Sequence, residues 1–439
     1  MGGGAFKQAT APGHPTLNTP RMSPEEYEDL KGEYLCHIRA YFTDPCVTVA
    51  VLTEAPEKKD YGDIDVFIGI DREVNFLDLA TRVGATGIIR HSPDKCTLGV
   101  RKDCTSSASP PIVYSTINTN SSSRSASPAE TTITTEEYAQ IDINVVPTDL
   151  VEWHIFHSAC GDLNGMLGHM LTNIGFTITH HGLWLRMKEL DAAKTIERSS
   201  VSDADGKIFL SKDPYQVMRF LGISIDKWNC GFDTLGDFYA WLGACRMLHP
   251  VAIKLKRDRA DDRHREQKRD VYRRFFFEWL PAHVPEMNES VEKEEQVRQI
   301  ERLRERYLGE ALDFFGKREL YEEKHAAMVL AVRNAVAANL LRPLVAKHSG
   351  TTLKKLPELL RSFRRFVKFD ESGQPYVAAE AQTDAESQLH RFLDDKCSSL
   401  RDETEAEEFV KSKWEELKTV QRQQAKAMTA AEKVEPRAE

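Results

Sequence analysis

Hydrophobic and polar residues alternate along two short segments in the first half of the chain. In 61–70 (YGDIDVFIGI), Asp63 and Asp65 alternate with aliphatic residues, and in 140–146 (QIDINVV) the same layout surrounds Asp142. Successive side chains of a β-strand point to opposite faces. The pattern therefore predicts two strands, each with an apolar face in the core and an acidic face opposite.

Three carboxylates on two short strands indicate a functional site if their face is sequestered from water. Desolvated like charges must be offset by a metal ion, another cation or a shared proton. The alternative is a solvated polar face. The apolar alternation, the repeat of the layout and Gly62, which permits close backbone approach, favour the site.

Periodicity elsewhere predicts an α/β (α+β) domain with a mixed sheet, followed by an all-helical C-terminal domain. A capping box at Ser23–Glu26 opens a helix that runs to about 42. Further strands are expected at 47–53, 175–180 and 182–187, with a helix near 75–83 that is followed by the segment 87–91. Helical periodicity then dominates, over 263–280, 288–314, 320–345, 353–367 and 383–432.

Composition shifts divide the chain into candidate domains. Residues 1–22, with their GGG and APGHP runs, are expected to form a disordered leader before the 23–190 domain. A Ser/Thr/Pro-rich stretch at 104–135 is expected to be a mobile insertion, with one strand at 111–117. A helical domain at 207–370 and a charged helical tail at 383–439 complete the expected organisation.

The bulk composition is typical of a soluble cytoplasmic protein. Charged residues make up 29% of the 439 residues and the net charge is −9, which argues against a uniformly basic nucleic-acid coat. The longest apolar stretch, 325–341, is interrupted by Arg333 and Asn334, so no membrane span is expected. Eight cysteines without a Cys-x-x-Cys pair suggest reduced thiols, with neither a zinc site nor a disulfide framework.

Two basic segments stand out on this acidic chain. Segment 254–274 has ten Lys or Arg and five acidic residues. Segment 354–368 is also rich in basic residues and contains a single acidic residue, a Glu. Such stripes suit a phosphate backbone, although the first can equally be a solvated helix face laced with ion pairs. The candidate phosphate-backbone contacts are Lys254, Lys256, Arg257, Arg273, Arg274, Arg361, Arg364 and Arg365.

Two further groups are candidates for substrate binding. In the first, a helix expected to open at Gly161–Asp162 would direct N–H groups towards an anion, with His157 as a base and Ser158 or Cys160 as a nucleophile. The alternative is that Ser158 or Asp162 only caps the helix and Cys160 packs. In the second, the acids of the basic segment either form salt bridges or recognise a cationic substrate; they are Asp261, Asp262 and Glu266.

The acidic pattern resembles the nucleotidyltransferase superfamily that includes DNA polymerase beta, over about 30–190. The resemblance implies that Asp63, Asp65 and Asp142 hold two metal ions, such as Mg²⁺, for phosphoryl transfer. One departure matters. The family's Gly-Ser pair, which grips the triphosphate, should fall in 49–60 (VAVLTEAPEKKD), a stretch without Gly that has Glu54 where phosphate would bind.

Over most of 30–370 the chain also resembles a fungal group of nucleotidyltransferase-fold proteins, the arginine-containing cyclodipeptide synthases. The resemblance rests on GDIDV, a variable insertion, IDINV, FHS…GDL…LG and a helical C-terminal half. It implies that arginine from arginyl-tRNA is joined to a second aminoacyl-tRNA to give cyclo(Arg-Xaa) for secondary metabolism. Aminoacyl esters are already activated, so no triphosphate cradle and no cofactor would be needed, and no obligate protein partner is implied.

Three functions therefore remain open from the sequence. The first is a tRNA-dependent cyclodipeptide synthase, in which Asp63, Asp65 or Asp142 binds a guanidinium or an ammonium group in place of metals. The second is a metal-dependent nucleotidyltransferase acting on RNA or a small molecule. The third is a non-catalytic RNA-binding protein on a degenerate nucleotidyltransferase fold, favoured by the missing Gly-Ser pair and opposed by the retained carboxylates.

Overall fold

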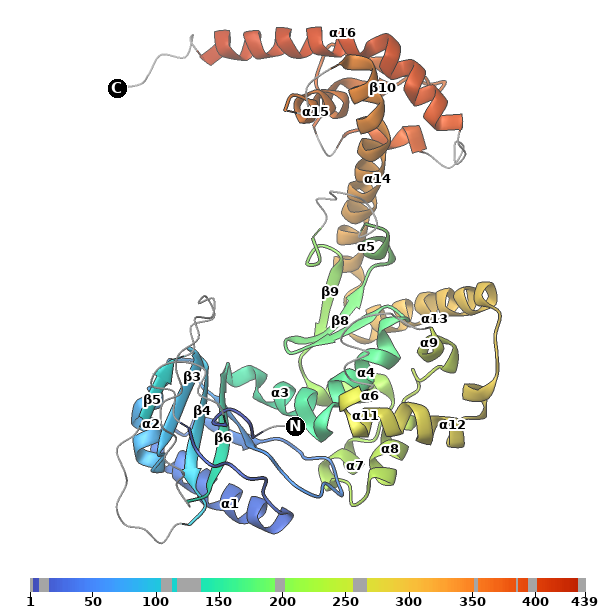
Figure 1. The fold of residues 1–439 in the computed structure, drawn as a ribbon. Helices are drawn as coiled ribbons and strands as arrows, with labels where there is room; N and C mark the ends of the chain where they lie inside the picture. The colour runs from blue at the N-terminus through green and yellow to red at the C-terminus, as the bar shows by residue number, and fades with distance from the viewer. Residues whose placement is uncertain are drawn as a thin grey trace. The chain divides into compact units, whose positions relative to one another are not determined.

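The computed structural model describes residues 3–7, 16–103, 113–116, 136–193, 202–255, 267–350, 354–383, 386–393 and 401–432. The chain forms two compact units (Figure 1). One contains Met1–Trp184 and Phe209–Phe315, and the other contains Leu185–Ile208 and Gly316–Glu439. Five of the candidate contacts named above lie outside the described residues: Lys256, Arg257, Asp261, Asp262 and Glu266.

A mixed sheet forms the N-terminal part of the first unit, as the sequence predicts, and its strand order is β1-β2-β6-β4-β3-β5. Its strands are β1 (Thr48–Val51), β2 (Ile64–Gly69), β3 (Gly87–Ser92), β4 (Lys95–Arg101), β5 (Val113–Thr116) and β6 (Tyr138–Val146). β2 pairs with β6 in parallel and β3 with β5 in parallel, whereas the other neighbours are antiparallel. β2 and β6 thus lie side by side.

One face of this sheet is apolar and packs against α1 (Pro24–Tyr41) and α2 (Phe76–Val83). The capping box at Ser23 starts α1 as expected, and Gly84 ends α2 in the left-handed conformation that favours glycine. The strands contribute their alternate aliphatic residues to this core, including Ile64, Val66, Ile141 and Ile143. Burial of this face stabilises the domain.

The opposite face is covered at its two ends and carries the acids between them. At one end, α3 (Val151–Ser158) packs on Phe67 and Val146 through Val151. At the other end lies the segment Gly3–Lys7, whose Phe6 is fully buried. The described part of the predicted leader therefore packs on the sheet.

The rest of the first unit is largely helical and has an aromatic core that includes Phe238, Trp241 and Phe275. Its α-helices are α4 (Leu163–Thr172), α6 (Pro214–Leu221), α7 (Ile225–Cys230), α8 (Leu235–Gly243), α9 (Pro250–Lys254), α11 (Asp270–Arg274), α12 (Leu280–His283) and α13 (Lys293–Phe314). Shorter helical turns are η1 (Thr148–Leu150), η2 (Ala159–Gly161), η3 (Phe275–Trp279) and η4 (Pro285–Asn288). A second sheet contains β7 (Phe176–Thr179), β8 (Gly182–Arg186) and β9 (Lys207–Ser211).

The second unit is built on two long helices whose core includes Leu341, Phe363 and Val410. Its elements are α5 (Lys188–Ala193), α14 (Arg318–Ser349), α15 (Leu356–Phe366), β10 (Val367–Phe369), β11 (Pro375–Val377), η5 (Leu389–Leu393) and α16 (Arg401–Glu432). The hairpin of β10 and β11, together with β9, corrects the expectation of an all-helical C-terminal domain. The C-terminal region is largely helical.

α14 is the one described helix with the length and apolar composition to cross a membrane. Only 28% of its most apolar window is buried inside the protein. A single helix of this kind is weak evidence, because core helices of soluble proteins pass the same test.

Candidate acidic site

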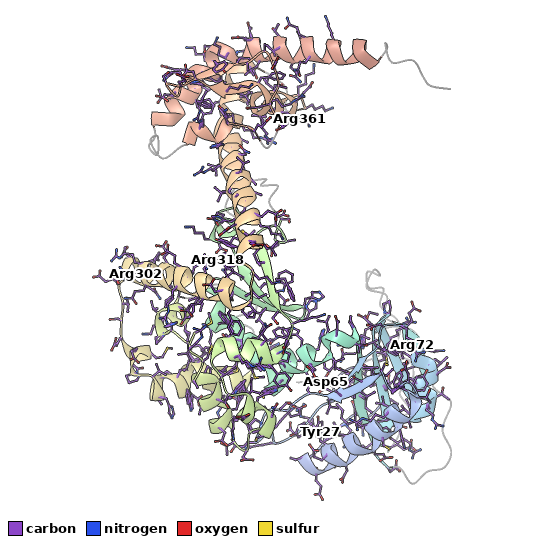
Figure 2. All side chains as sticks on the ribbon, turned by 180° about the vertical axis from the view of Figure 1, so that it is seen from behind. Tyr27, Asp65, Arg72, Arg302, Arg318 and Arg361 are labelled. Atoms are coloured by element: carbon purple, nitrogen blue, oxygen red, sulfur yellow. The ribbon has the colours of Figure 1, made fainter. Side chains whose placement is uncertain are left out.

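Strand pairing brings the acids of the two distant segments together. Asp65 of β2 lies directly opposite Asp142 of β6, and Asp63 precedes β2 on the same face as Asp65. Neighbouring strands lie roughly 4.8 Å apart, so the carboxylates share one small region of the sheet. Figure 2 labels Asp65 on this strand.

Burial and mutual repulsion favour the protonated forms of two of these acids. The pKa of Asp65 is raised to about 7, first by burial and then by the charges of Asp63, Asp142 and Glu54. The pKa of Asp63 is also raised, by burial and by Asp142, against a smaller opposing effect of Lys58. Within the described ranges, no Lys or Arg forms a salt bridge with Asp63, Asp65 or Asp142. The cluster is therefore mostly buried and has no salt-bridge partner among the described residues, while Lys58 and Lys95 oppose the rise in the pKa values of Asp63 and Asp65 without pairing with them.

Asp142 is held by two side chains of the same face. The hydroxyl of Thr97 donates to Asp142 Oδ1 at 2.8 Å, and Nε2 of Gln140 donates to the same oxygen at 3.0 Å. Nε2 of His91 lies 2.9 Å from Thr97 Oγ1. Because the Thr97 proton is directed at the carboxylate, this contact is consistent with the imidazole donating its Nε2–H. Asp142 therefore has a fixed orientation.

The sequence analysis did not find Thr97, Gln140 or His91. Thr97 lies on β4, which that analysis did not predict. The alternation of the apolar residues Cys96, Leu98 and Val100 around it is a signal that could have found the strand.

Glu54 adds a fourth carboxylate beside the cluster. It accepts hydrogen bonds from the Tyr27 hydroxyl at 3.2 Å and from Lys58 Nζ at 2.7 Å. The rings of Tyr27 and Tyr61 are stacked at 3.9 Å, and Lys58 Nζ lies 4.4 Å from the centre of the Tyr61 ring. The stretch where a triphosphate cradle would be expected thus contributes the carboxylate of Glu54, paired with Lys58, and the stacked rings of Tyr27 and Tyr61 lie beside this pair.

Two histidines of α3 lie towards the same face of the sheet. The ring of His154 is 5.7 Å from that of Phe67, which is two residues beyond Asp65 on β2. The pKa of His157 is lowered to about 4, first by burial and then by His154 and His180. Burial lowers the pKa of His154 as well. Both imidazoles are therefore neutral at pH 7 and can accept a proton.

The structure changes the local setting of His157, Ser158 and Asp162. His157 and Ser158 end α3, whereas the sequence suggested that they precede a helix N-terminus. The next regular helix, α4, begins at Leu163, with Asp162 in the N-cap position but without a side-chain capping bond. Asp162 is 8% exposed. Ser158 is therefore at the wrong end of its helix to bind an anion through the helix dipole.

Cys160 is fully buried between α3 and α4. Burial and the charge of Glu54 raise the pKa of its thiol to about 12. A thiol nucleophile reacts as the thiolate, so Cys160 is a packing residue at neutral pH rather than a nucleophile.

Three of the described basic residues of 254–274 are engaged by the protein itself. Lys254 donates to the backbone carbonyls of Glu286 and Glu289. Arg273 pairs with Asp270 at 2.9 Å and with Glu278 at 2.6 Å. Arg274 lies 3.9 Å from Glu278. These residues therefore fit the second of the two interpretations of the segment, a helix face with intramolecular ion pairs, better than a phosphate-binding site.

The basic face of α15 differs. Arg361 is exposed (labelled in Figure 2), and among the described residues it forms no salt bridge. Arg364 is half-buried, and Arg365 lies over the Phe366 ring at 5.8 Å. The apolar residues of this helix, including Phe363, face the core of the second unit. This arrangement leaves Arg361 available to a phosphate.

The acids do not form a metal-binding group in this structure. Across the described ranges, no three His, Cys, Asp or Glu side chains are arranged to hold a metal ion. Carboxylate oxygens are the right donors for Mg²⁺, but their placement here does not fit one.

No protein-family model matches this chain, and no curated protein matches it.

Proposed function

We propose that this protein is a tRNA-dependent cyclodipeptide synthase that joins arginine from arginyl-tRNA to a second amino acid delivered as aminoacyl-tRNA. The observation that carries the proposal is the cluster of Asp63, Asp65 and Asp142. It is mostly buried, and no described Lys or Arg pairs with it. A guanidinium or an α-ammonium group of the substrate would supply the missing positive charge.

The electrostatics of Asp65 suit a cationic ligand. Without a partner its pKa is about 7, so the carboxyl group is partly protonated at neutral pH. A bound cation favours the ionised form and lowers the pKa. Binding should therefore release a proton and strengthen as the pH rises from 6 to 8.

The chemistry requires no metal ion. The α-amine of one aminoacyl ester attacks the ester carbonyl of the other, an amide bond forms, and the tRNA hydroxyl leaves with a proton. A second attack in the opposite sense closes the ring and releases the second tRNA. The imidazoles of His154 and His157 are neutral and are candidates to accept the proton of the attacking amine, but the lowered pKa values make both of them weaker bases than a free imidazole.

One observation favours nucleotidyl transfer as the second candidate. The parallel pairing that sets Asp65 opposite Asp142 gives the arrangement expected from the resemblance to nucleotidyltransferases. Against it stand the absence of Gly from 49–60, the carboxylate of Glu54 in that stretch and the lack of a metal-binding arrangement among the described residues.

An assay with a charged tRNA pool tests the proposal. Wild-type protein incubated with arginyl-tRNA and the other aminoacyl-tRNAs should give cyclo(Arg-Xaa), detected by mass. Asp65→Asn should give none, whereas Asp29→Asn, a change at an exposed position of α1, should behave as wild type.

Two results would contradict the proposal. Absence of a cyclic dipeptide with every amino acid would remove the synthase function. Transfer of a labelled nucleotide to RNA that is abolished by a chelator would establish the second candidate instead.

A further inference from the structure

The segment Gly3–Lys7 lies on the acidic face of the sheet. Phe6 is fully buried, and its ring comes within 3.2 Å of the point where a side chain on Gly99 would begin. Gly99 of β4 is the register partner of Gln140 of β6. The ring therefore packs one step along the strands from Thr97 and Asp142.

Backbone groups of this segment contact the residues of the cluster. A backbone hydrogen bond from Gly3 reaches the carboxylate of Asp63, where it opposes the rise in pKa. The N–H of Ala5 donates to Oε1 of Gln140 at 3.1 Å. The carbonyl of Gly3 accepts from the hydroxyl of Thr19 at 3.2 Å, which fixes the segment from the other side.

The contact of Ala5 determines which way the Gln140 amide points. Because Oε1 accepts from the backbone N–H, Nε2 must face Asp142, to which it donates at 3.0 Å. Gln140 is 4% exposed, so water offers no equivalent partner. Loss of the Ala5 bond would free the amide to rotate and would leave Asp142 with Thr97 alone.

We propose that segment Gly3–Lys7 is a positioning element of the acidic site, which fixes Asp63 directly and Asp142 through Gln140. Its effect on catalysis rests on the function proposed above, whereas its effect on the geometry of the site does not.

Two adjacent glycines provide a matched test. A Cβ on Gly3 would lie 2.2 Å from the carbonyl oxygen of Gly62, and Gly3 has φ +83°, so Gly3→Ala must displace the backbone. A Cβ on Gly4 meets nothing within 4 Å. Gly3→Ala and Gly4→Ala therefore make the same chemical change one residue apart and differ only in whether they dislodge the segment.

Hydrogen exchange at the Ala5 amide, measured by NMR, is the direct readout. Gly3→Ala should accelerate exchange at least roughly tenfold, while Gly4→Ala stays within about twofold of wild type. Gln140→Leu, which removes the acceptor from the other side, should also accelerate it. Amides of β6 should keep their protection in all three variants, which shows that the domain remains folded.

The proposal is overturned if Gly3→Ala and Gly4→Ala exchange alike, or if Gln140→Leu leaves Ala5 as protected as in wild type. Should Gly3→Ala not fold, Phe6→Ala takes its place, with Phe76→Ala on the opposite face as its control. These results do not depend on activity and decide the geometry even if no cyclic dipeptide is made.

Where the synthase activity is present, kinetics add a second readout. Gly3→Ala and Gln140→Leu should each lower kcat/KM about tenfold, and the double variant should lose less than the product of the two, because both changes disturb Asp142 through Gln140 while Gly3→Ala also disturbs Asp63. Multiplied losses in the double variant would contradict a shared positioning role.

Discussion

The two faces of the N-terminal sheet are made by the same strands, but one face is apolar and the other carries the acidic cluster. On β2 and β6, Ile64 and Ile143 point into the apolar core under α1 and α2, while Asp65 and Asp142 point to the other face. Burial of the first pair stabilises the domain, and burial of the second pair costs free energy. Alternate residues of one strand thus serve stability and the candidate function. Substitutions on the apolar face should lower stability with little effect on activity, and substitutions on the acidic face should lower activity without lowering stability.

The largest effect is expected from the acids. Asp65→Asn keeps the shape of the side chain but removes the charge that would bind a cation, so product formation should fall at least roughly a hundredfold. The variant should unfold at the same temperature as wild type or higher, because like-charge repulsion is relieved. A loss of activity that merely follows a loss of folded protein would contradict the distinction between the faces.

The apolar face should behave in the reverse manner. Ile143 is fully buried, so Ile143→Ala should lower the free energy of unfolding by about 3 kcal/mol, measured by urea denaturation. Activity per folded molecule should change little. Ile143→Val, which removes one methyl group, should lower the free energy of unfolding by only about 1 kcal/mol.

The pH dependence of stability should expose the cost of the acidic face. The folded state raises the pKa of Asp65 from 3.8 to about 7, so between these values the folded protein holds more protons than the unfolded chain. Its contribution to stability is present below pH 4 and is lost as the pH rises through 7. Asp65→Asn should therefore gain on the order of 4 kcal/mol over wild type between pH 4 and pH 8. If the free energy of unfolding depended on pH in the same way in both proteins, the pKa of Asp65 would not be raised by folding, and its carboxyl group would be hydrated.

A smaller effect is expected from the side chain that orients Asp142. Thr97→Val keeps the volume of this buried residue but removes the hydroxyl that donates to the carboxylate. Stability should fall by about 1 kcal/mol, measured by urea denaturation, and activity should fall several-fold. Thr97→Ser keeps the hydroxyl and should retain most of the activity; equal losses for Val and Ser would place the effect in packing instead.

Short-range patterns predicted the acidic strands well. Alternation of period two placed β2 and β6 and assigned Asp63 and Asp65 to the polar face of the first strand and Asp142 to the polar face of the second, because the side-chain direction of a strand is a local property. The capping box located the start of α1 for the same reason. The pairing of β2 with β6 is non-local, and it was expected only from the resemblance to the nucleotidyltransferase superfamily.

Tertiary packing decided what the sequence analysis missed. Glycine-rich Gly3–Lys7 has no local signal for structure, and it is ordered by the burial of Phe6 and by bonds to residues more than a hundred positions away, such as Gln140. The predicted helix start at Gly161–Asp162 is confirmed by α4, but the short helix α3, which takes in His157 and Ser158 at its C-terminal end, was not predicted. The contact of Thr97 with Asp142 follows from the pairing of β4 with β6, which places the two residues opposite each other.

Binding of L-arginine methyl ester, measured by calorimetry at pH 8, tests the cation site most directly. The ester carries the guanidinium and the free α-ammonium of the proposed substrate, and norleucine methyl ester serves as the control without the guanidinium. We expect saturable binding of the arginine ester to wild type, at least tenfold weaker binding to Asp65→Asn, and weaker binding of the control. Equal affinity of wild type and Asp65→Asn for the arginine ester would contradict the cation site.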